Sequence, residues 1–367
     1  MALTGRDLIS MLDFGRVELE AIFDKADSMQ RLTRTCKSYL KDKVMSTLFF
    51  EPSTRTRLSF EAAMHRLGAS VVGFADPKVS SVAKGETLGD TIRTVESYSD
   101  VIVVRHRIEG AAKLAAEIAQ VPVINAGDGS QHHPSQTLTD LYTIRNQFGR
   151  IDCRKIMFMG DLRHTRSASS FAYGISHYNN VTLFLVSPIS LMMRPEITDH
   201  LKRKRVKYEE TENPLDFVEE ADVTCVTRLQ EERLEDPSQA EMLRGSYALN
   251  QDLLKHARDD AIVMHHLPRI EEIPIEIDYT PHARYFEQAA NGLLVRMAFL
   301  YLSLRKFKYE PARRREAPTA EAQLLRCSNT NCISNQPREP VVPKLSEVRR
   351  ESVTVLQCEY CGRYSKK

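Results

Sequence analysis

The chain has 367 residues, a length that predicts two or three domains rather than one. Hydrophobic residues make up 42% of it and charged residues 27%, which is typical of a folded globular protein and excludes a disordered or fibrous one. The formal net charge of +2 gives no reason to expect a nucleic-acid or membrane partner, and no apolar run reaches the length of a membrane span. The first residues do not read as a secretory signal.

The first three hundred residues alternate between short apolar runs and helical patterns. The expected strands are residues 44–50, 70–74, 101–104, 121–125, 155–160, 181–186, 223–227 and 261–264. The expected helices are residues 53–67, 87–98, 134–147, 165–178 and 285–304. Most strands are apolar or β-branched almost throughout, as is typical of parallel strands buried on both faces. This pattern predicts an α/β protein with two doubly wound parallel-sheet domains.

We place the domain boundary where the pattern breaks, in the stretch GDGSQHHP. The expected parts are a first domain at 1–132 to which the helix 285–307 returns, a second domain at 133–284, a linker at 308–324 and a last domain at 325–367. The linker is rich in charge, proline and alanine, and its cluster Arg313–Arg315 is interpreted as a solvated face rather than a binding patch.

The segment EPSTRTR, residues 51–57, directly follows an apolar strand and opens a helix. A helix N-terminus directs backbone N–H groups and a favourable dipole outward, which suits an anion. The hydroxyls of Ser53, Thr54 and Thr56 and the guanidinium group of Arg55 would add donors. On spacing alone, a helix capped by Ser53 with surface arginines explains the segment equally well.

The same segment resembles the carbamoyl phosphate signature of the aspartate and ornithine carbamoyltransferases. The resemblance extends over residues 1 to about 307, through KGET at 84–87, RH at 105–106, NAGDG at 125–129, HPSQ at 133–136, GD at 160–161 and LPR at 267–269. It implies the fold, the reaction and the roles of individual residues.

For carbamoyl phosphate the resemblance implies three groups of contacts. The phosphate would be held by Ser53, Thr54, Arg55, Thr56 and Arg105. The carbonyl oxygen would be polarised by Thr56, Arg105 and His133. The carbamoyl NH2 group would donate to Gln136 and to the backbone carbonyls of Leu267 and Pro268. Arg57 is expected to brace the loop.

The second half of the chain distinguishes the acceptor substrate. Aspartate has two carboxylates and calls for arginines, whereas ornithine calls for an acid. The segment TRLQEER at 227–233 resembles the aspartate-binding segment of aspartate carbamoyltransferases, and the marker segments of ornithine enzymes are absent. The implied aspartate ligands are Ser80, Lys84, Arg166, Arg228, Gln230 and Leu267.

One position departs from the family. His266 stands where relatives usually have proline, which bears on local rigidity and on the response to pH near the site. The Leu267–Pro268 bond can still be cis, as in relatives.

In the family, the loop at residues 76–86 enters the active site of a neighbouring subunit. Ser80 and Lys84 would therefore act on another copy, and the smallest competent unit would be a homotrimer or a multiple of it. A solvated surface loop is the alternative. Glu51 is matched to a residue that bridges Arg166 and Arg233 when the two domains close.

The resemblance implies aspartate carbamoyltransferase activity, an early step of de novo pyrimidine biosynthesis. The motifs contain no activated nucleophile, and no metal is expected at the reaction centre. The aspartate amine would attack the carbamoyl carbon directly, with fixed charges stabilising the tetrahedral intermediate. The residues expected to act in catalysis are Arg55, Thr56, Lys84, Arg105, His133 and Gln136.

The seven cysteines are unevenly distributed. Cys36, Cys153 and Cys225 are scattered, while Cys327, Cys332, Cys358 and Cys361 lie in the last forty or so residues. Two close pairs of thiolates fit one structural zinc ion in a small β module, whose folding the metal would support. Reduced thiols elsewhere favour a cytoplasmic protein, where disulfides are the weaker alternative.

The segment around these cysteines resembles the zinc domain of the aspartate carbamoyltransferase regulatory chain. The nucleotide-binding domain that normally precedes that domain is missing, so we expect no ATP or CTP site on this chain. Two other functions stay open at this point: a carbamoyltransferase for ornithine or a related amine, and a non-catalytic assembly or nucleic-acid-binding protein.

Overall fold

The structure is a computed structural model that describes residues 3–31, 38–234, 243, 247–309, 326–350 and 353–365. Cys36, the arginine cluster at 313–315 and all of the expected linker except residues 308 and 309 lie outside these ranges. The chain forms two compact units. The first comprises residues 1–135 and 293–367, and the second comprises residues 136–292.

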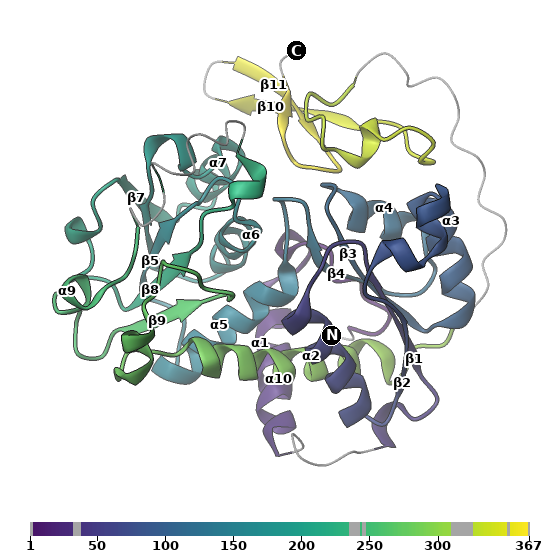
Figure 1. The fold of residues 1–367 in the computed structure, drawn as a ribbon, viewed down its shortest axis with the longest axis horizontal. Helices are drawn as coiled ribbons and strands as arrows, with labels where there is room; N and C mark the ends of the chain where they lie inside the picture. The colour runs from purple at the N-terminus through teal and green to yellow at the C-terminus, as the bar shows by residue number, and fades with distance from the viewer. Residues whose placement is uncertain are drawn as a thin grey trace. The chain divides into compact units, whose positions relative to one another are not determined.

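The first unit is built on a four-stranded parallel sheet in the order β2-β1-β3-β4 (Figure 1). Its strands are β1 Val44–Phe49, β2 Ser70–Phe74, β3 Val101–His106 and β4 Val123–Asp128. The sheet reverses its direction of growth between β1 and β3, which are paired in register from Met45↔Val101 to Phe49↔Arg105. In open α/β sheets, ligands bind at the carboxyl ends of the strands beside such a switch point.

Helices flank this sheet. They are α1 Arg16–Gln30, α2 Thr54–Arg66, α3 Leu88–Val95, α4 Ala111–Ile118 and the long α10 Tyr285–Leu304, whose C-terminal part belongs to this unit. The expectation that strands are buried on both faces is wrong for β2. Its residues are exposed or half-buried, and Val72 keeps 48% of its surface, because β2 is an edge strand.

The second unit contains a five-stranded parallel sheet in the order β7-β6-β5-β8-β9. Its strands are β5 Lys155–Gly160, β6 Thr182–Val186, β7 Lys207–Thr211, β8 Val223–Thr227 and β9 Ile262–His265. Its helices include α6 Arg166–Ile175, α7 Pro195–Arg203, the short α9 Gln251–Leu254 and most of α5 Pro134–Phe148. The switch point of this sheet lies between β5 and β8.

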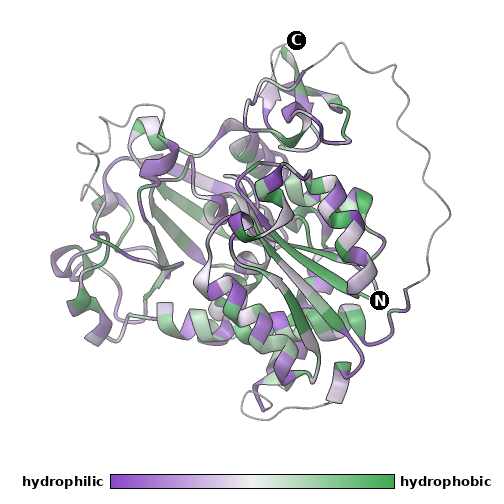
Figure 2. Cartoon of the chain, turned by 45° about the vertical axis from the view of Figure 1, so that its right-hand side comes forward, coloured by the Kyte–Doolittle hydropathy of each residue, from purple (hydrophilic) through white to green (hydrophobic). Residues whose placement is uncertain are grey.

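The edge strand β7 was not expected from the sequence. Its residues KYEET are polar and half-buried or exposed, so the apolar pattern that identified the other strands is missing there. The remaining strands of both parallel sheets are predominantly hydrophobic, while their helices alternate hydrophobic and hydrophilic residues (Figure 2). The predicted fold class of two parallel-sheet α/β domains is confirmed.

The C-terminal residues form an antiparallel sheet in the order β10-β11-β12. The strands are β10 Leu345–Arg350, β11 Val353–Cys358 and β12 Tyr364–Ser365, with Val348 paired to Val355. This confirms the predicted small β module, which belongs to the first unit. Within the ranges described above, no helix combines the length and the apolar character needed to cross a membrane.

Short 3-10 helices complete the two units. They cover Met11–Asp13, Ser38–Leu40, Pro77–Val79, Ser81–Lys84, Glu96–Tyr98, Ile189–Leu191, Pro214–Asp216, Glu231–Arg233, Ile275–Tyr279 and Ile333–Asn335.

Candidate active site and metal centre

The predicted phosphate loop follows β1 and opens α2. Ser53 is the N-cap residue of α2, with extended backbone, but its side chain makes no capping hydrogen bond. The simple interpretation of Ser53 as an ordinary helix cap therefore does not describe this site, and its hydroxyl remains a donor for a ligand. Thr56 is buried in the first turn, and partial burial lowers the pKa of Arg55, which still stays a cation at neutral pH.

Arg57 differs from its neighbours in the loop. Its guanidinium group forms an ion pair with Glu61, one turn along the same helix, at 3.0 Å. This local contact stabilises the first turns of α2, and the role of Arg57 in bracing the loop stays a prediction.

Across the switch point, Arg105 lies near the end of β3. Its Nη1 atom donates to the backbone oxygen of Ala126 at 3.2 Å, and its Nη2 atom lies 3.5 Å from Glu51 Oε1. The sheet thus places Glu51 and Arg105 at the carboxyl ends of β1 and β3. The next residue, His106, accepts a hydrogen bond from the Ile108 backbone N–H through Nδ1, and burial lowers its pKa to about 4. His106 is therefore neutral at pH 7 and orders the loop after β3.

His133 lies at the end of the first unit and is buried. Its Nδ1 atom is 3.4 Å from the Ser135 hydroxyl. Gln136, the next predicted ligand along α5, begins the second unit.

The loop that carries Ser80 and Lys84 is made of two short 3-10 helices. The Ser80 hydroxyl donates to the backbone oxygen of Pro77 at 2.8 Å and accepts from the Val82 N–H at 3.3 Å. Lys84 is exposed, and among the described residues its ammonium group has neither a hydrogen-bond nor an ion-pair partner. Within one chain the structure does not engage Lys84 with the phosphate loop.

In the second unit, the side chain of Asp161 connects the two segments predicted to bind aspartate. It is buried beyond β5 and accepts hydrogen bonds from the backbone N–H groups of His164 at 3.0 Å and Gln230 at 3.1 Å. His164 precedes Arg166 at the start of α6, and Gln230 follows Arg228 after β8. Asp161 therefore fixes both arginine-bearing loops at the switch point of the second sheet.

Arg228 faces a cavity of about 320 Å³ that Gly160, Asp161 and Thr227 also line. In this conformation the Arg228 guanidinium group pairs with Glu232 at 2.5 Å and with the side-chain oxygen of Gln230 at 3.3 Å. Both predicted aspartate ligands on this segment are thus in mutual contact.

The third predicted segment of this unit follows β9. The Leu267–Pro268 bond is cis, and Leu267 has a φ of 50°. Arg269 is held by a two-point contact with Asp278 and by the hydroxyl of Tyr285, so within the LPR motif it acts as a structural anchor.

Asp140, which the motifs did not reveal, is fully buried on α5 and contacts two of the predicted segments. One of its carboxylate oxygens accepts from Gln136 Nε2 at 2.8 Å and from Gln288 Nε2 at 2.6 Å, and the other lies 3.0 Å from His266 Nε2. An ionised carboxylate only accepts hydrogen bonds, so the Gln136 amide must present its oxygen away from Asp140. The spacing of four residues between Gln136 and Asp140 on a helix was the signal that could have identified this contact.

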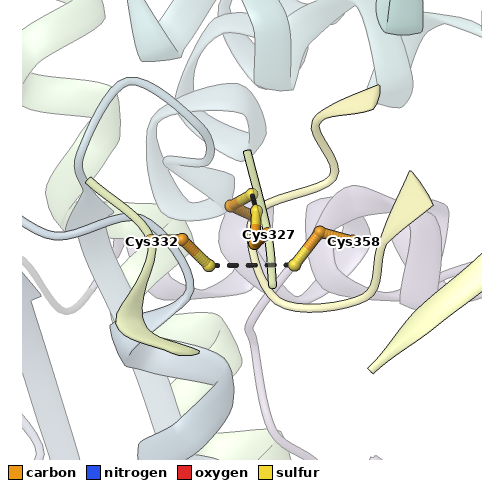
Figure 3. Close-up of side chains that lie close together, drawn as sticks. Cys327, Cys332 and Cys358 are labelled. Carbon is orange, nitrogen blue, oxygen red and sulfur yellow. Dashed lines mark hydrogen bonds between the residues drawn. The ribbon is translucent and has the colours of Figure 1, made fainter. Parts of the chain in front are cut away.

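The four C-terminal cysteines converge in the first unit. Their sulfur atoms all lie within 4.8 Å of one another, and all four residues are buried. The sulfur atoms of Cys327 and Cys361 are 3.5 Å apart. Those of Cys332 and Cys358 are 3.7 Å apart and point toward each other (Figure 3). A tetrahedral zinc site with Zn–S bonds of ~2.3 Å has S–S edges of about 3.8 Å, whereas a disulfide requires about 2.05 Å. The arrangement fits four thiolates around one metal ion and does not fit disulfides.

Comparison with family models divides the chain into three matched regions. Residues 6–146 match the carbamoyl-P binding domain of aspartate/ornithine carbamoyltransferase, and residues 152–303 match the Asp/Orn binding domain of the same family. Residues 322–367 match the metal binding domain of the aspartate carbamoyltransferase regulatory chain. The chain therefore belongs to the aspartate/ornithine carbamoyltransferase family.

The individual relatives are aspartate carbamoyltransferases, which is one of the two activities of the family. The aspartate carbamoyltransferase catalytic subunit of Thermococcus onnurineus is 51% identical over 302 residues, which cover 82% of this chain and 97% of that protein. That of Thermofilum pendens is 48% identical over 301 residues, covering 82% and 96%. This chain joins catalytic domains of the aspartate carbamoyltransferase type and a regulatory-chain type metal-binding domain in one polypeptide.

The similar solved structures are also aspartate transcarbamoylases. The M. jannaschii aspartate transcarbamoylase catalytic subunit shares 48% identity with a TM-score of 0.74, over 81% of this chain and 97% of that one. The Trypanosoma cruzi enzyme in complex with carbamoyl phosphate shares 37% identity with a TM-score of 0.78, covering 82% and 97%. The same enzyme has been solved with N-(phosphonacetyl)-L-aspartic acid and with aspartate and phosphate.

Proposed function

We propose that this chain transfers the carbamoyl group of carbamoyl phosphate to L-aspartate, releasing N-carbamoyl-L-aspartate and phosphate in pyrimidine biosynthesis. The observation that carries the proposal is the placement of the segments bearing Arg166 and Arg228 around the buried carboxylate of Asp161, at the switch point of the second sheet. Two arginines suit the two carboxylates of aspartate, whereas the cationic side chain of ornithine would be repelled.

Carbamoyl phosphate binding is assigned to the first unit. Ser53, Thr54 and the first backbone N–H groups of α2 would hold the phosphate oxygens, with Arg55 and Arg105 supplying positive charge. The uncommitted hydroxyl of Ser53 supports this assignment. Thr56, Arg105 and His133 would also donate to the carbonyl oxygen, where negative charge develops during the reaction.

The carbamoyl NH2 group needs acceptors. Gln136 is suited to this role because its amide nitrogen already donates to Asp140, so the amide oxygen is the atom left for a ligand. The backbone carbonyls of Leu267 and Pro268 would complete the set. The aspartate would be bound by Arg166, Arg228, Gln230 and the Leu267 carbonyl.

In this mechanism the neutral amine of aspartate attacks the carbamoyl carbon. A tetrahedral intermediate forms and collapses as the C–O bond to phosphate breaks, and the departing phosphate accepts the amine proton. The protein contributes positioning and preorganised donors, of which the loss of one typically lowers the rate ~100–1000-fold. Glu51, paired here with Arg105, is proposed to turn to Arg166 and Arg233 when the domains close.

The ammonium group of Lys84 is exposed and has no partner within the described residues, which supports a role for this loop outside its own chain. We propose that Ser80 and Lys84 complete the site of a neighbouring copy, so that the working unit is a homotrimer or a multiple of it in the cytoplasm. The metal is proposed to be one structural zinc ion per chain, because four buried thiolates at tetrahedral spacing are the ligands that zinc prefers.

Incubation of the purified protein with carbamoyl phosphate and either L-aspartate or L-ornithine tests the proposal. We expect carbamoylaspartate and no citrulline, and a loss of about 100-fold or more in kcat/KM for aspartate in Arg166→Ala. Arg163→Ala, at an exposed position of the same loop, is the matched control and should retain normal activity. Citrulline formation would instead support the ornithine alternative, and absence of both products would support a non-catalytic protein.

A further inference from the structure

Within the first unit, the metal module packs against the loop between β3 and α4. The buried carboxylate of Glu109 accepts from Arg363 at 3.0 and 3.2 Å and from the Asn329 side chain at 2.8 Å. The backbones of Glu109 and Cys332 form an isolated parallel bridge. Gly110 has a φ of 84° and no room for a side chain, because a Cβ atom there would lie 2.8 Å from Tyr360. The four cysteines of the metal module are therefore part of the core of this unit.

A second contact of the module reaches a different element, the N-terminus of α3. The carboxylate of Glu339 accepts hydrogen bonds from the backbone N–H groups of Leu88 at 2.7 Å and Gly89 at 3.1 Å, one on each oxygen. A carboxylate is favoured there by the dipole of the helix and by charge-assisted hydrogen bonding.

Glu339 completes the hydrogen bonding at this helix end. Of the first four N–H groups of α3, Asp90 donates to the Thr87 hydroxyl at 3.0 Å and Thr91 donates to the Thr87 backbone oxygen at 3.1 Å. The remaining two are those of Leu88 and Gly89, which are both buried and both bound by Glu339. Without Glu339, two buried donors would lose their partners, which a helix end tolerates poorly.

The residues beside Glu339 lie along the same segment. A Cβ atom on Gly89 would come within 2.7 Å of the Pro340 ring, so only glycine permits this approach. A Cβ atom on Gly85 would lie 3.4 Å from Arg338 Nη1. The segment 338–340 of the metal module thus follows the base of the loop that ends in Lys84 and continues into α3.

We propose that Glu339 is a positioning residue for Lys84. By capping α3, Glu339 fixes the end of the loop at 76–86 that continues into this helix. The folding of the metal module therefore determines how Lys84 is presented to the active site of a neighbouring copy. This rests on the proposed function of Lys84 in a neighbouring site. It gives the fused module a role in positioning a residue of the active site.

The test uses the full-length, metal-loaded protein and compares Glu339→Ala with Lys344→Ala. Lys344 lies on the same docking surface and pairs with Glu117 on α4 at 3.2 Å, and within the described residues it has no hydrogen bond or ion pair with α3. For Glu339→Ala we expect normal metal content, amide exchange at residues 86–92 accelerated about tenfold and KM for aspartate raised about tenfold. KM for carbamoyl phosphate should change less. Lys344→Ala should leave both readouts near those of the wild type. Glu339→Gln should show smaller changes than Glu339→Ala, because its amide oxygen can still accept a hydrogen bond.

Removing the metal provides a second test, which does not depend on enzymatic activity. Removal of zinc with a chelator should accelerate exchange at residues 86–92 as Glu339→Ala does, and readdition of zinc should reverse it. Unchanged exchange and unchanged aspartate KM in Glu339→Ala, alongside a large loss in Lys84→Ala, would overturn the inference and leave the proposed function intact. Full activity of Lys84→Ala would refute the role of Lys84 itself, and with it the positioning role of Glu339.

Discussion

The Nε2 atom of His266 lies 3.0 Å from the buried carboxylate of Asp140. The other oxygen of that carboxylate holds the side-chain nitrogen of Gln136. One carboxylate therefore orients Gln136 and also fixes the residue that precedes the Leu267–Pro268 carbonyls. All three proposed acceptors of the carbamoyl NH2 group depend on Asp140.

The Asp140→Asn substitution tests this dependence. An asparagine amide can turn its NH2 group toward Gln136, which removes the constraint that leaves the Gln136 oxygen for the substrate. We expect kcat to fall about tenfold, the equivalent of one misplaced hydrogen bond, with little loss of fold. Asp259→Asn, at an exposed position, is the control. Steady-state kinetics with an unchanged kcat in Asp140→Asn would show that Gln136 is oriented by other contacts.

Restoring the usual family residue at position 266 should make this protein less stable. His266→Pro removes the hydrogen bond to Asp140 and the 2.9 Å contact with the Ser167 hydroxyl. A hydrogen bond to a charged group contributes ~1.5–3 kcal/mol, whereas a compatible proline returns only ~0.4–1 kcal/mol by restricting the unfolded chain. We expect a net loss of about 1 kcal/mol in the free energy of unfolding, measured by urea denaturation. An equal or higher stability would mean that the histidine network contributes nothing.

The metal centre should be necessary for the C-terminal module. Cys358→Ser removes one of four thiolates, and the small β sheet has little core of its own to replace the metal. We expect the zinc content to fall from one per chain to near zero, and the assembled protein to dissociate on chelation. Metal analysis and sizing before and after chelator treatment measure this. An assembly of unchanged size after complete loss of zinc would show that the metal module is not required for assembly.

Acidification should destabilise the second unit through His200. This residue is buried on α7, with its Nε2 atom 3.0 Å from the Ser176 hydroxyl, and burial, assisted by Arg203 and Lys204, lowers its pKa to about 4. Because the unfolded chain binds this proton near pH 6.5, the stabilisation is complete above pH 6.5 and is lost as the pH falls toward 4.

The loss attributable to His200 is at most about 3 kcal/mol. His200→Gln should therefore be less stable than the wild type at pH 7.5 and approach it at pH 4.5, as measured by denaturation at both pH values. A constant difference between the two proteins across this range would exclude His200 as a source of acid sensitivity.

The sequence was sufficient for the elements whose pattern is purely local. Apolar or β-branched runs predicted β5 and β8 at their observed bounds, and helical spacing predicted α10 from Tyr285 to Leu304. It was insufficient for the edge strand β7, because a strand paired on one side can be polar and still complete the sheet.

Short motifs predicted the candidate site residues. They did not predict the contacts that hold those residues in place. Asp140, Asp161 and Glu339 each bind groups on distant segments, and such partners are set by the tertiary fold rather than by spacing along the chain. Asp161 lies in the GD motif, which implies no role for its side chain, and Glu339 lies outside the motifs. Residues that orient a site are therefore the part that requires the structure.

The central claim is that arginines of both domains and a lysine from an adjacent copy bind two anionic substrates together. A crystal structure with N-(phosphonacetyl)-L-aspartic acid tests this most directly. We expect the phosphonate at Ser53–Thr56 and Arg105, the two carboxylates at Arg166 and Arg228, and Lys84 contributed by a neighbouring chain. Guanidinium groups turned away from the analogue, or a site completed by one chain alone, would contradict it.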